Sequence, residues 1–163
     1  MNDMQPNDVA PNCTEQRIRL YDGSERRIFL CDEEVPYPDG KLIVSSTDTE
    51  GVITHCNDSF VDMSGYSEAE LIGQPHSILR HPDIPKAAFA DMWNTVQGGE
   101  KWAGYIKNLR KDGRYYWVYA TVVPNKRAGV IKGFTSVRRK PSRDRVNEAQ
   151  ALYVEMKKAE VNS

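Results

Sequence analysis

The rest of the chain is organised around the stretch His76-Ser77-Ile78-Leu79-Arg80-His81-Pro82-Asp83-Ile84-Pro85, called here the proline segment. Its two prolines exclude a long regular helix, because each fixes its own φ angle and biases the preceding residue away from the α region. The backbone is therefore expected in short turns that project two imidazoles, a guanidinium and a carboxylate from one rigid segment. Such a segment is either a surface loop or the wall of a pocket for a ligand with carbonyl, amide or phosphate groups.

Length and charge narrow the classes of protein to consider. A chain of 163 residues predicts one domain with appendages, and 22 basic against 23 acidic residues argue against binding to nucleic acid or to an anionic membrane surface. No apolar run reaches membrane-spanning length, and the polar, acidic start does not resemble a signal peptide. Cys13, Cys31 and Cys56 are odd in number and widely spaced, which implies neither a disulfide framework nor a zinc site. We therefore expect a reduced, cytoplasmic setting.

Residues 1–40 are expected to be an extension that precedes the main domain. Residues 1–16 are polar, with almost nothing to bury, and predict a disordered lead. Asp22-Gly23-Ser24 then separates two short runs, 17–21 and 25–30, and the alternation beside the Asp-Gly turn predicts a hairpin. The alternative is an extended tail that pairs with nothing.

The main domain is expected over residues 41–141. Asn57 is a candidate N-cap, and Ser67 with Glu70 has the spacing of a capping box. Apolar periodicity and turn residues predict strands at 42–47 and 52–56, helices at 57–65 and 86–96, and strands at 102–109, 115–123 and 130–137.

This order of elements predicts an α+β fold. A five-stranded antiparallel sheet would carry short helices on one face and enclose a pocket between the two layers. A C-terminal helix over residues 142–163 follows, with an apolar seam formed by Val146, Ala149, Tyr153 and Met156. The seam spans barely two heptads, so it is expected to dock on its own domain or on a partner.

Residues 46–141 resemble the flavin-binding PAS domains of bacterial aerotaxis receptors. The longest resembling run is 80–93, Arg-His-Pro-Asp-Ile-Pro-Lys-Ala-Ala-Phe-Ala-Asp-Met-Trp. Shorter runs are Ile53–Phe60, Ser64–Tyr66, Gly73–His76, Gly99–Trp102, Lys107–Asn108, Tyr116–Val118 and Ser136–Arg138. The resemblance implies a non-covalently bound FAD whose redox state is read as a signal of oxygen or respiration.

The resemblance also implies which residues hold the flavin. Six positions match: Arg80, His81, Asp83, Trp102, Asn108 and Asn57. Among them, Asn57 is expected to be the partner that steadies Asp83.

The side-chain chemistry suits these roles. The indole of Trp102 offers a face for offset stacking on an isoalloxazine ring, worth about 1 kcal/mol beyond burial, or it is a plain core residue. The amide of Asn108 has donors for flavin carbonyls, or it bonds a neighbouring strand. Arg80 can clamp a diphosphate or a flavin oxygen through charge-assisted hydrogen bonds. His81 and His76 titrate near neutral pH and so suit a charge sensor, although a structural role is the alternative, especially for His76.

The sequence also departs from the aerotaxis receptors. Leu109 replaces a basic residue, which predicts one missing charge at the rim of the site, and Phe134 replaces a tyrosine found in some members. The extension is longer than expected, and the sequence contains no transmembrane span, HAMP domain or signalling coiled coil. The chain therefore resembles either a freestanding sensor module or a fragment of a receptor.

Three functions remain open at this point. The first is a flavin redox sensor that reports to a downstream signalling protein or a receptor domain. The second is a haem-binding gas sensor with His81 or His76 as axial ligand. The third is a cofactor-free module that forms a homodimer. No nucleophile–base pair, metal-ligand cluster or glycine-rich phosphate loop indicates an enzyme. A photoreceptor with a reactive cysteine also fits poorly, because Cys56 lies on a predicted strand.

Overall fold

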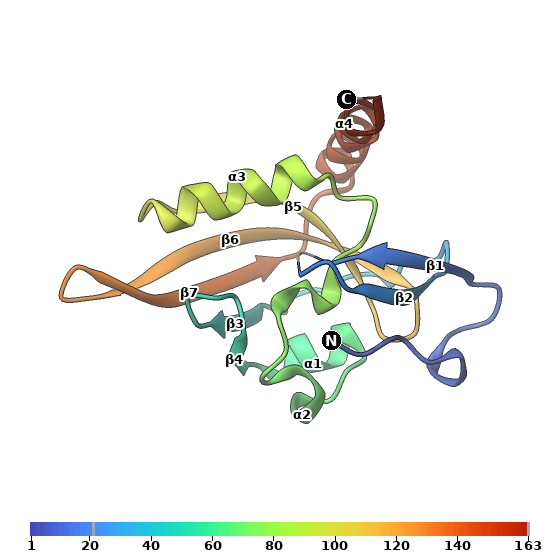
Figure 1. Ribbon diagram of the computed structural model, residues 1–163, viewed down its shortest axis with the longest axis horizontal. Coiled ribbons are helices and arrows are strands. Elements are labelled where there is room, and N and C mark those ends of the chain that lie inside the picture. Colours follow the sequence, from blue (N-terminus) through green and yellow to red (C-terminus); the bar gives the residue numbers. More distant parts are fainter. Residues whose placement is uncertain (21, 163) are drawn as a thin grey trace.

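A five-stranded antiparallel sheet with strand order β4-β3-β7-β6-β5 forms the centre of the molecule, as Figure 1 shows. A computed structural model describes residues 1–20 and 22–162. The strands of the sheet are β3 (Ile43–Thr47), β4 (Ile53–Cys56), β5 (Trp102–Leu109), β6 (Tyr115–Arg127) and β7 (Val130–Arg139). The predicted α+β fold is confirmed. β6 and β7 extend further than the sequence predicts, because a bulge after Asn125 lets pairing continue to a tight turn at Ala128 and Gly129.

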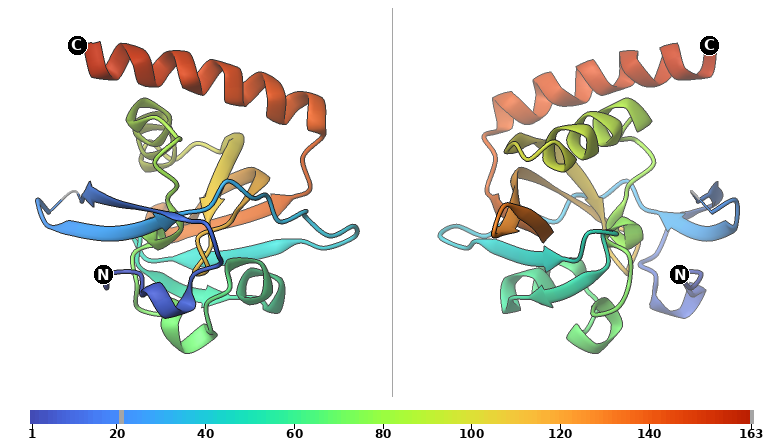
Figure 2. Two further views of the ribbon diagram at one scale, coloured as in Figure 1. Left: turned by 90° about the vertical axis from the view of Figure 1, so that its right-hand side faces the viewer. Right: turned by 60° about the vertical axis from the view of Figure 1, so that its left-hand side comes forward.

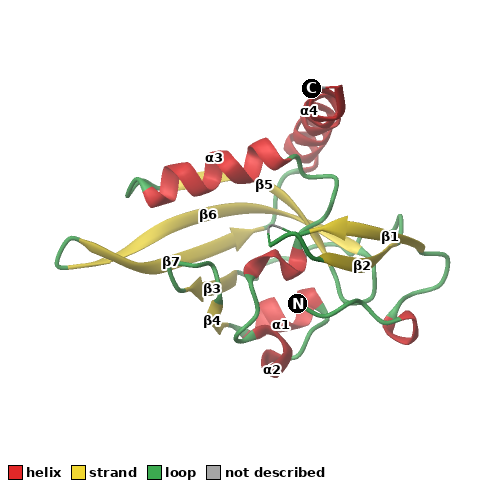
Figure 3. Ribbon diagram, viewed as in Figure 1, coloured by secondary structure: helices red, strands yellow, loops and turns green. Residues whose placement is uncertain are grey.

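Short helices connect the two halves of the sheet. They are α1 (Asp58–Ser64), α2 (Glu68–Leu71), the 3-10 helix η2 (His76–Leu79) and α3 (Lys86–Gln97). The predicted caps are present. Asn57 caps α1, Gly65 ends it in the left-handed conformation, and Ser67 and Glu70 form a reciprocal capping box. α1 and α2 lie at the β3–β4 end of the sheet and α3 lies beside β5 (Figures 1 and 3).

Helix α4 (Arg143–Asn162) packs on the opposite face of the sheet from the short helices. Successive side chains of a strand point to opposite faces, so Tyr105 and Trp117 face away from their neighbours Ile106 and Val118. The Tyr153 hydroxyl donates to the backbone oxygen of Tyr105 at 2.7 Å, and its ring stacks on Trp117. Figure 2 shows α4 lying across the domain. The predicted apolar seam therefore docks on its own domain.

The N-terminal extension is ordered, which corrects the expectation of a disordered lead over residues 1–16. It contains the 3-10 helix η1 (Pro6–Asp8) and a hairpin of β1 (Thr14–Arg19) with β2 (Glu25–Leu30). The hairpin follows from the Asp-Gly turn, although Tyr21, the last residue of the first predicted run, lies outside the described residues, as does Ser163 at the end of the predicted C-terminal helix.

Two sets of contacts hold the extension in place. Met4 and Ile28 form a small separate core with Leu109, which is fully buried. Leu109 is therefore not a rim position with a missing charge, because the extension covers it. Arg26, only 2% exposed, donates to the backbone oxygen of Ile78 in η2 at 3.1 Å. The sequence conceals this packing, because the apolar residues involved are few and scattered.

The expectation that the cysteines stay unpaired is also wrong for two of them. Cys13 and Cys31 form a disulfide, and Cys56 is free. The hairpin register explains the pairing: Thr14 faces Leu30, so Cys13 and Cys31 follow as neighbours at its open end. A count of cysteines and their spacing could not reveal this proximity.

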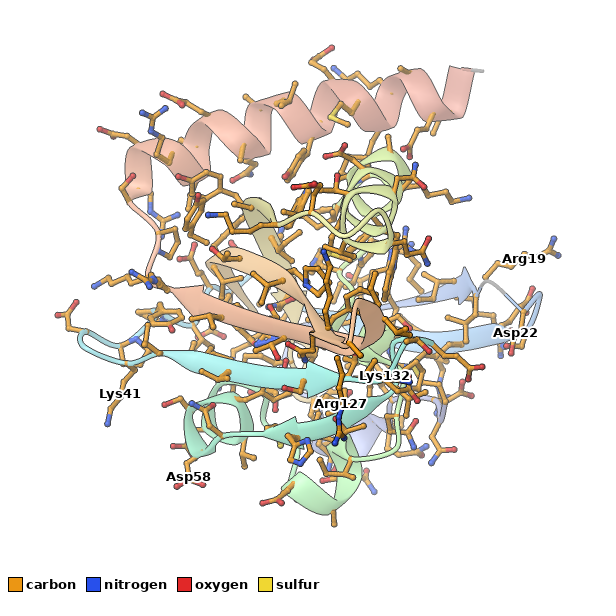
Figure 4. The ribbon with its side chains drawn as sticks, turned by 90° about the vertical axis from the view of Figure 1, so that its left-hand side faces the viewer. Arg19, Asp22, Lys41, Asp58, Arg127 and Lys132 are labelled. Carbon is orange, nitrogen blue, oxygen red and sulfur yellow. A yellow bond between two sulfur atoms is a disulfide. The ribbon has the colours of Figure 1, made fainter. Side chains whose placement is uncertain are left out.

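Charged side chains lie at the periphery of the fold. Figure 4 labels six of them, all exposed: Arg19, Asp22, Lys41, Asp58, Arg127 and Lys132. None of the helices in the described residues is both long and apolar enough to cross a membrane.

Candidate functional site

A cavity of about 880 Å³ lies between the sheet, the short helices and the hairpin of the extension. This volume falls in the range of sites for small molecules and cofactors. The proline segment forms one wall, through His76, Ser77, Leu79, Arg80, Pro82 and Ile84. Helix α3 contributes Phe89, Met92, Trp93 and Val96. The hairpin lines a further side with residues that include Ile18 and Leu20.

The floor of the cavity is the inner face of the sheet. Phe134, Ser136 and Arg138 alternate along β7 and all line the cavity, as do Val118, Ala120 and Val122 along β6. The register pairs Arg138 with Ala120, and Ala120 with Gly104. This row of small residues leaves a flat hollow with a guanidinium at one end.

Trp102 stands at the other end of that hollow. Its ring lies over Gly104, where a Cβ atom would come within 2.5 Å of the indole. The indole N–H donates to Asp91 of α3 at 3.0 Å, and the residue is 8% exposed. Gly104 and Asp91 thus fix a large aromatic face at the cavity, and this arrangement suits a planar ligand.

Two other predicted site residues line the same cavity. Arg80 is partly buried and its guanidinium lies over the ring of Phe89, 4.4 Å from the centroid. Asn108 is 4% exposed and bridges to Arg80 through the backbone. The structure therefore brings together Arg80, Trp102 and Asn108, which come from two separate segments of the sequence.

His81 and Asp83 lie outside the lining of this cavity, on the side of the proline segment that faces α4. Asp83 accepts a hydrogen bond from Lys107 at 2.8 Å, and together they line a second groove of about 400 Å³ beneath α4. Burial raises the pKa of Asp83, but the Lys107 hydrogen bond together with the charges of His81, Lys107 and Lys157 outweighs burial, so the pKa of Asp83 is lowered. The His81 Nδ1 accepts from the Asp83 backbone N–H at 3.0 Å. Burial, followed by the charge of Lys107, lowers the pKa of His81 to about 3.

Asn57 does not contact Asp83, which corrects the expectation that it steadies the carboxylate. Its side chain accepts from the backbone N–H groups of Phe60 and Val44 and donates to the backbone oxygen of Leu42. Its side chain thus joins the start of α1 to residues 42 and 44, at the beginning of β3. A residue after a strand and before a helix is well placed to cap that helix, and Asn57 does so.

Arg138 is the site residue that sequence reasoning missed. It is 2% exposed, and its Nη2 donates to Ser45 and, at 2.8 Å, to the Nε2 of His76. Its Nη1 has no hydrogen-bond partner among the described residues. The sequence analysis gave it no role in the site, although its alternation with Phe134 and Ser136 places it on the inner face of the sheet.

The histidines argue against a haem in this cavity. Only His76 of the three histidines lines it, and its Nε2 already faces Arg138. Burial and the charge of Arg138 lower the pKa of His76 to about 3, so the ring is neutral. A cation beside Nε2 disfavours a metal ion at that atom. Within the described residues, no cluster of three potential metal ligands is present.

Comparison with known proteins identifies the family of this fold and cavity. The family model described as the PAS fold matches residues 53–138, more than half of the chain. The chain belongs to the PAS family. This PAS domain is 46% identical over 125 residues to the aerotaxis receptor of Escherichia coli (strain K12), which covers 77% of the chain and 25% of the receptor. The resemblance predicted from the sequence is confirmed, and the chain spans about a quarter of the length of that receptor.

Two solved structures share the architecture. The PAS domain of a protein from Colwellia psychrerythraea aligns with a TM-score of 0.57 at 28% identity, over 61% of this chain and 86% of that one. The light-state structure of the blue-light photoreceptor Aureochrome1 LOV aligns with a TM-score of 0.60 at 22% identity, over 71% of this chain and 91% of that one. The second likeness supports the fold alone.

Proposed function

We propose that this PAS domain binds FAD non-covalently in the cavity and signals its redox state through protein–protein contacts, in aerotaxis-type signal transduction. One observation carries the proposal. Arg80, Trp102 and Asn108, which the resemblance to aerotaxis receptors marks for the flavin, converge on one cavity of about 880 Å³. The 46% identity to the aerotaxis receptor over most of the chain supports the same signalling class.

The residues of the cavity fit a flavin. An isoalloxazine ring is flat and largely apolar with a polar pyrimidine edge, and the floor offers a flat hollow between the indole of Trp102 and the guanidinium of Arg138. The amide of Asn108 suits a ring carbonyl. Arg80, only partly buried, suits the diphosphate, because a phosphate retains some hydration there. A buried donor without a partner, such as Nη1 of Arg138, calls for an acceptor from a ligand.

The other three predicted residues are proposed as positioning residues. The Asp83–Lys107 pair ties the proline segment to β5 beside Asn108. His81 holds the turn through its bond to the Asp83 backbone. Asn57 acts at a greater distance, because it fixes the start of α1. This helix carries Phe60, and the Arg138 guanidinium lies over the Phe60 ring.

A signal from the cavity has a direct route to α4. Lys157 donates to the backbone oxygen of Pro82, two residues after Arg80. Glu160 accepts from the backbone N–H of Ala87 at 3.0 Å, in the first turn of α3. A rearrangement at Arg80 would therefore change how α4 is held, and α4 is the proposed contact for a downstream signalling protein or receptor domain.

Trp102→Ala tests the proposal, with Trp117→Phe as the matched control on the opposite face of the sheet. Apoprotein is titrated with FAD while flavin fluorescence is followed. Wild type and W117F should bind with the same affinity, and W102A should bind roughly 10- to 100-fold more weakly, because it loses an aromatic face. Equal FAD affinity in all three folded proteins would contradict the assignment of the cavity.

A cofactor-free dimerisation module is the second candidate, and the exposed apolar residues of α4 favour it. Leu152, Val154 and Val161 are 58%, 48% and 79% exposed. Leu152→Asp should then abolish a dimer in analytical ultracentrifugation, whereas a wild-type monomer at high concentration would exclude this candidate.

A further inference from the structure

Arg138 is a buried cation without an anion. No carboxylate among the described residues lies within ion-pair distance of its guanidinium. Its Nη2 bonds are to the neutral groups Ser45 and His76, and Phe60 lies beneath it with the ring centroid 4.9 Å from Cζ. Buried charges in proteins are normally paired, because desolvation is costly. An arginine that is 2% exposed and left in this state indicates that a ligand completes the site.

The position of Nη1 shows which part of a ligand it meets. Arg138 lies on the floor of the cavity, where it pairs with Ala120 in the row that continues to Gly104. A diphosphate carries at least two negative charges and is strongly hydrated, so one buried arginine is a poor match for it, whereas Arg80 at the proline segment is partly exposed. The polar edge of a flat ring that lies over Ala120, beside the indole of Trp102, would reach Nη1 without burying a phosphate.

We propose that Arg138 binds the pyrimidine edge of the flavin ring through its Nη1–H and raises the reduction potential of the bound flavin. This inference rests on the proposed function. Two-electron reduction by an external reductant, with one proton taken up at N5, would leave one negative charge on the pyrimidine edge of a bound flavin. A fixed guanidinium beside that edge stabilises the reduced form more than the oxidised form. Ser45 and neutral His76 hold the guanidinium in place without cancelling its charge.

The experiment compares wild type with Arg138→Gln, and uses the exposed neighbouring Arg139→Gln as control. Each apoprotein is titrated with FAD and with riboflavin, and the potential of the FAD-saturated protein is measured by dithionite titration against a redox dye. R138Q should lose affinity for FAD and for riboflavin by the same factor, about 10- to 100-fold, because it loses a charge-assisted bond to the ring that both share. R139Q should match wild type.

The potential of R138Q should also be more negative. If the reduced flavin loses ten times more affinity than the oxidised flavin, the two-electron potential falls by about 30 mV. A loss of affinity for FAD alone would mean that Arg138 meets the phosphates and would overturn the ring assignment. Unchanged affinity and potential in R138Q would overturn the inference while the proposed function stands. A wild-type protein that takes up no flavin would overturn both.

Arg138→Lys keeps the test valid if R138Q fails to fold, as judged by circular dichroism. Lysine retains the charge but lacks the fork that reaches Ser45, His76 and the ring together. R138K should therefore bind both flavins more weakly than wild type and keep a potential close to that of wild type. Wild-type affinity in R138K would overturn the proposed bond from Nη1.

Discussion

The cavity and the groove beneath α4 lie on opposite faces of the sheet, and consecutive residues separate them. Asn108 faces the cavity, whereas Lys107 faces the groove, where it pairs with Asp83. The proline segment is divided in the same way, with Arg80 at the cavity and Asp83 at the groove. A motif that is continuous in the sequence thus serves two surfaces. One surface suits a ligand, and the other connects the same loop to α4.

Acid should destabilise the folded protein, because the proline segment buries a neutral histidine on each of its two sides. His76 and His81 have pKa values of about 3 in the folded state, against about 6.5 in the unfolded chain. Between these values the unfolded state binds more protons, so stability is full above pH 6.5 and falls as the pH decreases. Urea unfolding at pH 4.5 should show a loss on the order of 2–3 kcal/mol per histidine relative to pH 7.

His81→Asn should remove about half of that loss and leave the part due to His76. The depressed carboxylate pKa values, such as that of Asp112 at about 2, act mainly below this pH window. A free energy of unfolding that stays constant from pH 7 to 4.5 in wild type would contradict the burial of both neutral imidazoles.

Arg80→Ala and Asp83→Asn separate the two surfaces most sharply. R80A removes a guanidinium from the cavity and should weaken FAD binding by roughly 10- to 100-fold. D83N removes an ion-pair partner on the groove side, where the carboxylate is 62% exposed, and should weaken FAD binding by only a few-fold. Hydrogen exchange in α4 should rise more in D83N than in R80A. The reverse order of affinities would show that the groove, not the cavity, is the ligand site.

Asn57→Ala should have the smallest effect on FAD affinity, because the residue touches neither surface. It removes the N-cap of α1 and the bonds to Leu42 and Val44, and should lower the free energy of unfolding by about 1–2 kcal/mol. FAD titration at a temperature where the variant stays folded should give an affinity within about threefold of wild type. A loss as large as that of R80A would place Asn57 at the ligand.

The sequence predicts most of the fold of the main domain, because its turn and capping residues agree with its pattern of apolar residues. Apolar alternation locates the strands, and the capping residues Asn57, Gly65 and Ser67 are used as predicted. The extension is different, because its order depends on distant contacts such as Arg26 with Ile78 and Met4 with Leu109. No local pattern in the sequence encodes those contacts, and the same holds for the Cys13–Cys31 pairing.

The candidate site is only partly predictable for a related reason. The resemblance to aerotaxis receptors marks Arg80, Trp102 and Asn108, but the sequence does not say which face of the sheet the neighbouring His81 and Asp83 reach. Arg138 carries a recoverable signal, because it shares its strand face with Phe134 and Ser136. The periodicity of β7 is therefore the signal that could have marked Arg138 as a residue of the site.

The absorption spectrum of the purified protein tests the central claim most directly, followed by acid release and chromatography of any chromophore. The account predicts the near-ultraviolet and blue bands of an oxidised flavin, bleaching by dithionite, and FAD as the released compound. A colourless protein that also takes up no added FAD would contradict it.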